Sequence, residues 1–477
     1  MRALFACVAF VRQRLAIWSI APHVLRSVGP GVWHTPATPL SSPSTSMVPH
    51  LVTALTGPIN ELEARILESM PAIERWFRLE WMEHTPPFYT SVDLRNAGFK
   101  LAPVDTNLYP GGWNNLTREM LPLAVQAAMA AIEKICPEAK NLLLVPEGHT
   151  RNTFYLANVA RLKQIFSLAG LNVRLGTLDP DITAPTNFEL PDGQTLTVEP
   201  LVRTKRRLGL KDFDPCTILL NNDLSAGIPK VLEGLHEQYV LPPLHAGWAV
   251  RRKTHHFKSY EEVAKKFAKL LGMDSWLINP IHSHCGMVDF AEGAGIECVK
   301  SNVDALLGKV RRKYKEYGIN EKPFAVVKAD NGTYGMGIMT VRDAKELDDL
   351  NHRTRNKMSV VKDGQDVTEV LIQEGVPTYE RMHDAVAEPV VYMMDRYVVG
   401  GFYRVHAERG IDENLNSPGA KFVPLAFAES HHLPRPGEKP GASAPNRFYM
   451  YGVIGRLAML AASYELEATD PDAETYE

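Results

Sequence analysis

The segment PFAVVKADNGTYGMGIMTV, residues 323–341, constrains the fold of this chain more than any other part of it. An apolar run ends in Lys328, a loop carrying Gly332, Gly335 and Gly337 follows, and a second apolar run closes the segment. Two β-branched runs joined by a glycine-containing loop predict an antiparallel hairpin. The segment therefore fits neither G-x-x-x-x-G-K-[ST] nor G-x-G-x-x-G, because both of those turns lead from a strand into a helix.

A hairpin of this kind can serve a nucleotide. A flexible glycine loop can fold over a triphosphate and present backbone N–H groups to it, and Lys328 at the strand end supplies a positive charge to the phosphates. The alternative is an ordinary glycine-rich turn with a surface lysine. The hairpin alone leaves both interpretations open, so the surrounding sequence has to decide between them.

The first half of the chain alternates helices with short apolar strands. Residues 153–169 predict a helix that ends at Gly170, and residues 172–175 predict the strand after it. Buried strands are also expected at residues 141–145 (NLLLV) and 216–221 (CTILLN). This alternation is typical of an α/β sheet. The remaining expected elements are helices at residues 59–70, 116–136, 260–271, 304–317 and 449–467, a strand end at 275–280, and two strands on either side of Gly400 and Gly401.

Length and charge exclude several classes of protein. At 477 residues the chain should form two or three packed units. A net charge of −3 argues against a general nucleic-acid binder, and no apolar run reaches the ~18 residues of a membrane span. Five cysteines without a C-x-x-C pair indicate reduced thiols in a cytoplasmic protein.

The first 46 residues differ from the rest of the chain. They contain four arginines and neither aspartate nor glutamate, so the net charge of −3 becomes −7 when these four charges are left out. An acid-poor start with arginines is typical of a transit or export leader, although its apolar run LFACVAFV is short for a signal core. We interpret residues 1–46 as a leader or an over-long start, expect them to be disordered, and exclude them from the fold.

Three motifs downstream of the hairpin favour the nucleotide-binding interpretation over an ordinary turn. VLIQEGVPTYE (residues 370–380) is a strand that runs into a polar turn, DRYVVGGFYRVH (395–406) carries Arg404, and DENLNSPGAKF (412–422) is rich in asparagine and glycine. In this order, the motifs resemble the ATP-grasp superfamily, whose members clamp ATP between two α+β subdomains and join a carboxylate to an amine. The last two motifs particularly resemble the same region of bacterial glutathione synthetase.

Motifs in the first half narrow the resemblance. NLYPGGWNNL (107–116), PEGHTRNTFYLANVARL (146–162), LLNNDLSAGIP (219–229) and PPLHAGWAVRRKTHHF (242–257) are similar to the proteobacterial ATP-grasp type of glutamate–cysteine ligase. The resemblance implies that the chain forms γ-glutamylcysteine from L-glutamate and L-cysteine with ATP and Mg²⁺, as the first step of glutathione biosynthesis. It also implies an N-terminal α/β substrate-binding region at residues 47–300, followed by a C-terminal ATP-grasp region at residues 301–477.

The resemblance assigns roles to individual residues. Lys328 and Arg404 are the expected catalytic residues, because Lys328 would offset phosphate charge and an arginine can hold phosphate oxygens bidentately. ATP is expected to contact Lys309, Lys328, Gly332, Thr333, Tyr334, Gly335, Gly337, Gln373, Glu374, Gly375 and Val376. Substrate is expected to contact Asp105, Asn107, Asn114, Arg151, Asn152, Asn222 and Asp223, because Asp and Asn suit an α-ammonium group and Arg suits a carboxylate.

The metal ligands depart from the pattern of the resembled family. In glutathione synthetase, an acidic residue and a Glu-x-Asn follow the asparagine-rich loop on later strands, whereas here only a helix at 449–467 follows. Glu413, Asn414 and Asn416 are therefore the expected Mg²⁺ ligands, since their oxygens are of the hard type that this ion prefers.

Several alternatives remain open at the level of sequence. Each Asn or Asp in the predicted substrate set could instead cap a helix or a turn. HSHC at residues 282–285 could bind a metal, although it lacks a partner at zinc spacing, and the basic runs 203–207 and 251–253 are expected to be solvated. Alternative functions are a glutathione synthetase-like ligase, a non-catalytic nucleotide-binding scaffold, and a metal enzyme centred on HSHC. The sequence does not determine the oligomeric state.

Overall fold

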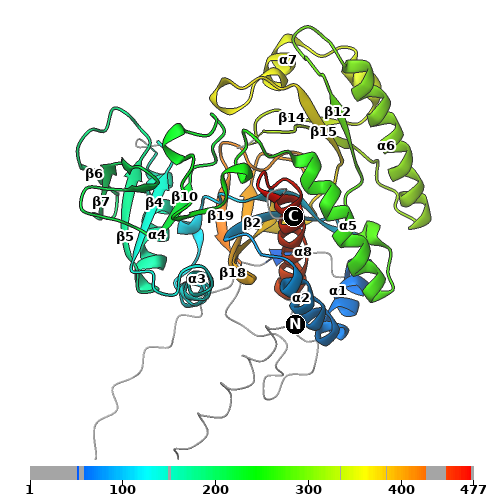
Figure 1. The fold of residues 1–477 in the computed structure, drawn as a ribbon. Coiled ribbons are helices and arrows are strands. Elements are labelled where there is room, and N and C mark those ends of the chain that lie inside the picture. Colours follow the sequence, from blue (N-terminus) through cyan, green and yellow to red (C-terminus); the bar gives the residue numbers. More distant parts are fainter. Residues whose placement is uncertain are drawn as a thin grey trace, which may run out of the picture. The chain divides into compact units, whose positions relative to one another are not determined.

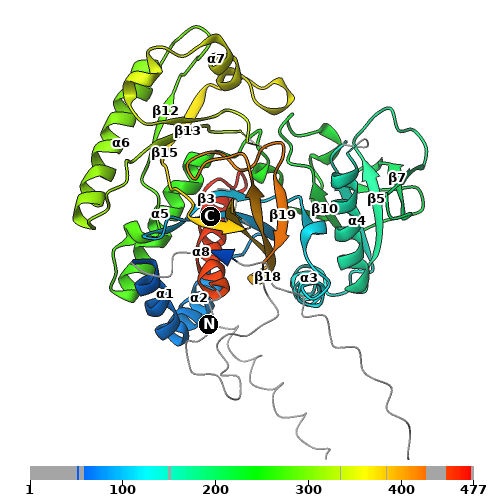
Figure 2. The same cartoon turned by 180° about the vertical axis from the view of Figure 1, so that it is seen from behind.

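A computed structural model describes residues 51–52, 58–148, 152–332, 335–382, 384–425 and 447–473. The described residues all lie in the second of two units of the chain, Val48–Glu477. The predicted leader at residues 1–46 lies outside the described residues. The second unit contains three larger sheets with helices packed against them (Figures 1 and 2).

The largest sheet has seven strands, and all of its pairs are antiparallel. One path runs through β1 (Leu51–Val52), β16 (Glu380–Met382), β17 (Ala385–Met394), β18 (Tyr397–His406) and β19 (Lys421–Pro424). β2 (Tyr89–Asn96) pairs with β17, and β3 (Leu101–Asn107) pairs with β2. This sheet thus combines strands from both sides of residue 300, and the expected division of the chain there stays a prediction.

Four helices cover this sheet: α1 (Pro58–Glu68), α2 (Met70–Glu83), α5 (Lys253–Leu271) and α8 (Phe448–Ala468). α8 is buried along most of its length, including Gly452 and Gly455, and it packs against α5, β2, β3 and β17. A Cβ on Gly455 would lie 3.3 Å from Val391, so the absence of a side chain lets the helix approach the sheet. The small and apolar composition of residues 449–467 reflects this central position.

The second sheet has six strands in the order β11 (Tyr239–Leu241), β10 (Thr217–Asn221), β4 (Asn141–Pro146), β5 (Asn172–Thr177), β7 (Thr195–Pro200) and β6 (Thr186–Glu189). All neighbours are parallel except β6 and β7. α3 (Leu121–Ile135) and α4 (Thr153–Leu168) share a core with this sheet. The alternation predicted for this half is confirmed, and Gly170 follows α4 with φ +93°.

The third sheet has four antiparallel strands in the order β12 (His282–Gly286), β15 (Glu369–Glu374), β13 (Ala325–Ala329) and β14 (Ile338–Val341). It packs against α6 (Ile296–Glu316) (Figure 1). β13 and β14 form the predicted hairpin, with Lys328 opposite Ile338. The remaining elements are α7 (His352–Ser359), the ribbon β8 (Val202–Thr204) and β9 (Arg207–Gly209), and 3-10 turns at Trp113–Asn115, Lys230–Leu232, Leu244–Ala246, Ser275–Leu277, Ala344–Leu347 and Lys362–Gly364.

Four expectations about local structure were wrong. The expected strand end at residues 275–280 begins with a 3-10 turn, because the Asp274 side chain accepts a hydrogen bond from Trp276 N. The two strands expected around Gly400 and Gly401 are one strand. The glycines there serve close packing and not a turn, because Cβ atoms at these positions would collide with Met120 and with the Val390 carbonyl. α5 and α6 begin earlier than the apolar periodicity indicated, and α2 was not anticipated.

The cysteines also differ from expectation. Cys285 of β12 and Cys298 of α6 form a disulfide rather than two reduced thiols, while Cys136 and Cys216 are free. Among the described residues, no helix is long and apolar enough to cross a membrane.

Candidate active site

Two adjoining cavities lie against the seven-stranded sheet. The first has a volume of about 70 Å³ and lies between this sheet and the face of the four-stranded sheet that carries Lys328. The second has a volume of about 280 Å³ and has several aromatic residues in its wall. Both cavities are lined by Asp93, Asp105, Arg404 and Asn416, so their contents would meet at these four residues.

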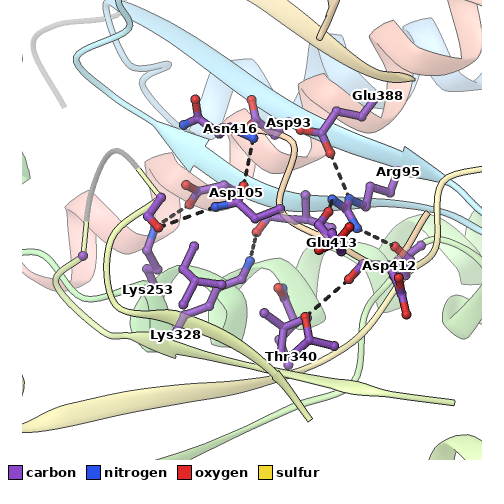
Figure 3. A pocket seen from close by; sticks show the side chains of 18 of the residues that line it. Asp93, Arg95, Asp105, Lys253, Lys328, Thr340, Glu388, Asp412, Glu413 and Asn416 are labelled. Atoms are coloured by element: carbon purple, nitrogen blue, oxygen red, sulfur yellow. Dashed lines mark hydrogen bonds and ion pairs between the residues drawn. The ribbon is translucent and has the colours of Figure 1, made fainter. Parts of the chain in front are cut away.

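Strand pairing explains why charged side chains gather at this junction. Residues alternate between the two faces of a strand, and directly paired residues share a face. Asp93 on β2 is paired with Asp105 on β3, and Glu388 on β17 is paired with Arg404 on β18. Figure 3 shows Asp93, Arg95, Asp105 and Glu388 close together in the cavity wall.

Arg404 is held by two carboxylates. Its Nη1 lies 2.7 Å from Asp93 Oδ2 and 2.6 Å from Glu388 Oε1. Burial alone would lower the pKa of Arg404, but Asp93 and Glu388 raise it, so the guanidinium stays charged. Its Nε is buried and has no hydrogen-bond partner in the protein. A buried charged donor without an acceptor is expensive, and an anionic ligand in the cavity would satisfy it.

The two carboxylates that bind Arg404 respond differently to their surroundings. Burial raises the pKa of Asp93, and the nearby negative charge of Glu388 raises it further against the opposing effect of Arg404. Burial would also raise the pKa of Glu388, but Arg95 and Arg404 together bring it below its usual range. Arg95 Nε lies 2.9 Å from Glu388 Oε2, and its other nitrogens donate to the carbonyls of Val376 and Glu413.

Two lysines complete the junction. Lys328 Nζ donates to the Val104 carbonyl at 2.6 Å, and Lys253 Nζ lies 2.5 Å from Asp105 Oδ1. Burial lowers the pKa of Lys328 to about 8, although Asp105 opposes the shift. Burial would raise the pKa of Asp105, but Lys253 and Lys328 lower it to about 2. The junction therefore carries both negative and positive charges that are partly compensated.

One face of the four-stranded sheet forms the wall opposite the charges. Val326, Lys328, Ile338, Thr340 and Gln373 all line the first cavity from this face. Gln373 is 1% exposed, and its Nε2 is buried without a hydrogen-bond partner. Apolar side chains beside an unused amide donor suit a flat heteroaromatic ring. The neighbouring Glu374 also lines this cavity, and its carboxylate lies 2.8 Å from Lys100 Nζ.

The asparagine-rich loop closes against the glycine hairpin. Asn414 Nδ2 donates to the Gly335 carbonyl at 3.5 Å. A Cβ on Gly335 would lie 2.7 Å from the Asn414 side chain, and the residue has φ +71°, so both space and backbone require glycine there. Glu413, Asn414 and Asn416, the predicted Mg²⁺ ligands, line the first cavity. The Glu413 carboxylate accepts from Gly410 N, and Asn414 Oδ1 accepts from Asn416 N. Their role as metal ligands stays a prediction.

The second cavity receives much of the predicted substrate set. Asp105, Asn107, Asn114 and Asp223 all line it. Its wall also contains the rings of Tyr109, Phe154, Tyr155, Trp248, Tyr392, Phe402 and Phe422. Asp223 is buried and lies 2.8 Å from Lys362 Nζ, which is also 2.8 Å from Glu147. Polar groups at one end and rings around them fit a small amino-acid-like ligand.

Other predicted residues do not line either cavity. The Asn152 side chain caps α4 by accepting from Tyr155 N, and Asn222 accepts from Leu224 N in a turn. Lys309 is exposed on α6, whose buried face carries Val303, Leu306, Leu307 and Val310, and it is not among the residues that line the first cavity. Gly337 allows close packing within the hairpin, and Gly375 allows the Phe324 ring to pack closely, because neither residue carries a side chain. Arg151, Thr333 and Tyr334 lie outside the described residues.

Four residues of the junction were missed by sequence reasoning: Asp93, Arg95, Lys253 and Glu388. The sequence contained a signal for Asp93 and Arg95, because Ser91, Asp93 and Arg95 occur at every second position of one strand and therefore share a face. Lys253 belongs to a basic run that was expected to be solvated, yet Arg251 and Lys253 are both only 4% exposed. HSHC cannot supply a cysteine thiolate to a metal, because Cys285 is in a disulfide.

Comparisons with known proteins agree on one family. The model of the glutamate–cysteine ligase family GshA matches residues 63–466. A crystal structure from Methylobacillus flagellatus KT, of a protein assigned as a gamma-glutamylcysteine synthetase, shares 60% sequence identity with a TM-score of 0.81, and the match covers 89% of this chain and 100% of that one. No curated protein matches the chain significantly.

Two more distant structures also match. D-alanyl-alanine synthetase A from Vibrio cholerae has 11% identity and a TM-score of 0.31, over 69% of this chain and 80% of its own. A glutathione synthetase-like effector from Globodera pallida has 10% identity and a TM-score of 0.33, over 77% and 80%. These similarities are too weak to carry a structural argument.

Proposed function

Because the chain belongs to the glutamate–cysteine ligase family, we propose that it joins the side-chain carboxylate of L-glutamate to the amino group of L-cysteine with ATP. The product is γ-glutamylcysteine, the first intermediate of glutathione biosynthesis. The observation that carries the proposal is the pair of cavities that meet at Asp93, Asp105 and Arg404. In this proposal the nucleotide binds at the first cavity and the amino acid at the second, and the reacting groups would meet at the residues that the two cavities share.

The reaction requires activation of the carboxylate. An oxygen of the glutamate side chain attacks the γ-phosphorus, the bond to the β-γ bridging oxygen breaks, and ADP leaves. The cysteine nitrogen then attacks the acyl carbon, phosphate leaves, and the nitrogen loses a proton to form the amide. Phosphoryl transfer depends mainly on positioning and on neutralising charge. Arg404 and Lys328 support the proposal, because both are buried cations that line the first cavity.

Lys328 and Arg404 contribute in different ways. With a pKa of about 8, Lys328 remains largely protonated at neutral pH and can pair with a phosphate oxygen. Arg404 offers its unused Nε–H from a position that Asp93 and Glu388 hold fixed. A donor that is held before the reaction stabilises charge without reorganising. Closure of the glycine hairpin over the first cavity would keep water from the acyl phosphate.

A divalent metal is expected with ATP, and we propose that it is Mg²⁺ bound by Asp93, Asp105 and Asn107. Asp105 and Asn107 on β3 have the spacing of the Glu-x-Asn in the resembled family, with aspartate in place of glutamate. Asp93 is the residue paired with Asp105, and its raised pKa reflects burial and neighbouring carboxylates. A cation between these oxygens would relieve that repulsion, and it would neutralise phosphate charge when bound. Glu413, Asn414 and Asn416 remain the alternative set.

The arrangement of the first cavity supports an ATP-grasp mode of binding. The four-stranded sheet supplies the hairpin, Lys328 and Gln373, and the seven-stranded sheet supplies the acidic residues and Arg404. We propose that the base lies near Gln373 and Val376, and that the triphosphate runs toward Arg404. Asn114 and Asp223 are proposed to bind the amino-acid substrate, with the predicted contacts of Arg151, Asn152 and Asn222 unchanged as predictions. Action in the cytoplasm is likewise a proposal.

The function is tested by a panel of ADP-release assays on the purified full-length chain. ADP and phosphate should appear only when ATP, glutamate and cysteine are all present. Turnover with γ-glutamylcysteine and glycine instead would favour a glutathione synthetase-like ligase. ATP binding that depends on Lys328 and Arg404, without turnover on any pair, would favour a non-catalytic scaffold.

A further inference from the structure

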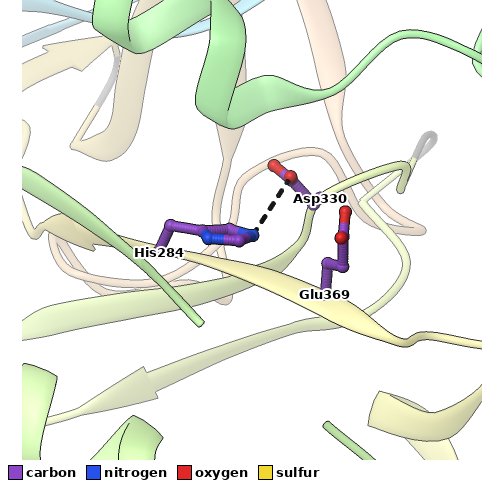
Figure 4. A group of neighbouring side chains, drawn as sticks. All are labelled: His284, Asp330 and Glu369. Carbon is purple, nitrogen blue, oxygen red and sulfur yellow. Dashed lines mark ion pairs between the residues drawn. The ribbon is translucent and has the colours of Figure 1, made fainter. Parts of the chain in front are cut away.

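Three potential metal ligands converge on the four-stranded sheet, outside the set of residues that lines the two cavities. They are His284 of β12, Asp330 directly after β13, and Glu369 at the start of β15 (Figure 4). One ligand atom from each lies within 4.8 Å of the other two. The strands fix this arrangement, because Asp330 N donates to the Glu369 carbonyl at 3.0 Å and Glu369 is paired with Gly286.

Asp330 carries an unsatisfied oxygen into this cluster. The residue is 1% exposed, and its Oδ1 accepts hydrogen bonds from Thr254 N and Thr254 Oγ1, both at 2.8 Å. Its Oδ2 is buried and accepts no hydrogen bond. His284 Nε2 lies 3.9 Å from Asp330 Oδ2, which is beyond hydrogen-bond distance. A buried carboxylate oxygen without a partner costs stability, and a bound ion is a common reason for such a group.

We propose that His284, Asp330 and Glu369 bind a divalent transition-metal ion at a site separate from the ATP-associated metal. One imidazole and two carboxylates are typical ligands of Zn²⁺, Mn²⁺, Fe²⁺ or Co²⁺, whereas Mg²⁺ and Ca²⁺ prefer oxygen alone. Two ionised carboxylates also balance the charge of the ion. The side chains of His284 and Glu369 are each 39% exposed, so water can reach the remaining coordination positions.

The observed distances are close to those of a metal site. Metal–ligand bonds of ~2.0–2.2 Å place ligand atoms at most about 4.4 Å apart, so a small rotation of the exposed His284 or Glu369 side chain would close the set. Arg252 Nε lies 3.3 Å from Glu369 Oε2 and would give up this contact. It has other acceptors, since Arg252 Nη1 donates to the backbone carbonyls of Val250 and Arg251.

Occupancy of this site would reach the active site through Asp330. The Asp330 carbonyl accepts from Lys253 N at 2.9 Å, and its Oδ1 holds the first turn of α5 through Thr254. Lys253 in turn binds Asp105 at the junction of the cavities. Asp330 also precedes Gly332 of the hairpin. A metal ion would therefore fix the end of β13 and the start of α5 together.

The test uses CoCl₂ titrated into metal-free, full-length protein without nucleotide. We expect one Co²⁺ per chain, a visible d–d absorption band and an increase in melting temperature. His284→Ala and Glu369→Gln should each weaken Co²⁺ binding by at least about tenfold. Both positions are partly exposed, so the variants should retain the wild-type circular dichroism spectrum, which is measured alongside. His352→Ala, at an exposed histidine of α7, is the matched control and should bind as the wild type does.

A further variant separates this site from the ATP-associated metal. Asp105→Asn should leave Co²⁺ binding in the absence of nucleotide unchanged. The proposal is overturned if the wild type binds no Co²⁺, if binding is unchanged in both His284→Ala and Glu369→Gln, or if Asp105→Asn abolishes it. Because the readouts are absorption, stoichiometry and melting temperature, the result is independent of ligase activity.

Discussion

Replacing Arg404 with methionine should destabilise the protein in a way that depends on its two carboxylate partners. Arg404 lies 2.7 Å from Asp93 and 2.6 Å from Glu388, and all three are largely buried. Removing one partner of a buried ion pair costs about 3–5 kcal/mol, because an uncompensated charge remains. For a unit of about 430 residues, a loss of 1 kcal/mol in the free energy of unfolding lowers the melting temperature by roughly 1 °C. We expect the melting temperature at pH 7.5 to fall by about 3–5 °C.

The pH dependence of this loss identifies its cause. In the wild type, Arg404 is one of the two cations that lower the pKa of Glu388. Without Arg404, the folded-state pKa of Glu388 rises, and that of Asp93 rises further. A carboxyl whose folded pKa exceeds its unfolded value of about 4 destabilises the fold progressively as pH increases through that interval. The difference between variant and wild type should therefore be smaller at pH 4.5 than at pH 7.5.

A double-mutant cycle measures the coupling directly. Glu388→Gln in the Arg404→Met background removes one of the two carboxylates that lost Arg404 and leaves Asp93 and Arg95 as the opposite charges, so the double variant should melt about 1–3 °C above the value expected from adding the two single losses. Arg396→Met, at a partly exposed arginine of the β17–β18 turn, is the control and should stay within about 0.5 kcal/mol of wild type. Differential scanning calorimetry provides all the values. Strictly additive losses, or a loss independent of pH, would refute the reasoning.

Three further predictions concern ligand binding. KM for ATP should rise as pH increases through about 8, where Lys328 loses its charge, and a pH series on Lys328→Met should show a high KM without that rise. Asp105→Asn should raise the Mg²⁺ concentration for half-maximal activity by about tenfold or more, while Glu413→Gln should leave it unchanged. The reverse pattern in a Mg²⁺ titration would favour the asparagine-rich loop as the metal site. Gly335→Ala should raise KM for ATP several-fold in initial-rate assays, because its Cβ would lie 2.7 Å from the Asn414 side chain and because residue 335 has φ +71°. An unchanged KM would contradict contact between the hairpin and the loop during ATP binding.

Local patterns predicted elements wherever one strand or helix carries its own signal. The run at residues 141–145, the helix that ends before Gly170 and the glycine hairpin all formed as expected. The motif resemblance to the glutamate–cysteine ligase family is also confirmed. Gly400 misled the interpretation, because glycine usually interrupts a strand, whereas here it makes room for Met120 and Leu116 against an unbroken β18.

Burial of charge was the least predictable property. A basic run is normally solvated, so nothing local distinguishes the buried Lys253 from an exposed lysine. Its environment is built by Asp105 and Trp248, whose ring lies 4.5 Å from Lys253 Nζ. Lys309 shows the converse error. Its position on a basic helix suggested a phosphate contact, but the apolar residues of α6 turn it outward.

The order of strands in the sheet offers a second position for the metal ligands that we propose. In the resembled glutathione synthetase a Glu-x-Asn follows the asparagine-rich loop on later strands, whereas here α8 is the helix that follows β19 among the described residues. An antiparallel sheet, however, requires neighbours in space and not in sequence. β2 pairs with β17 and β3 with β2, so Asp105 and Asn107 reach the sheet that carries Arg404 from the opposite end of the chain. A metal set proposed from Asp93, Asp105 and Asn107 thus restores the spacing implied by the resemblance, with its strands contributed by the N-terminal part. The same pairing brings Asp93 and Asp105 of residues 89–107 into the lining of the first cavity, and a fragment that begins at residue 301 would lack these two carboxylates.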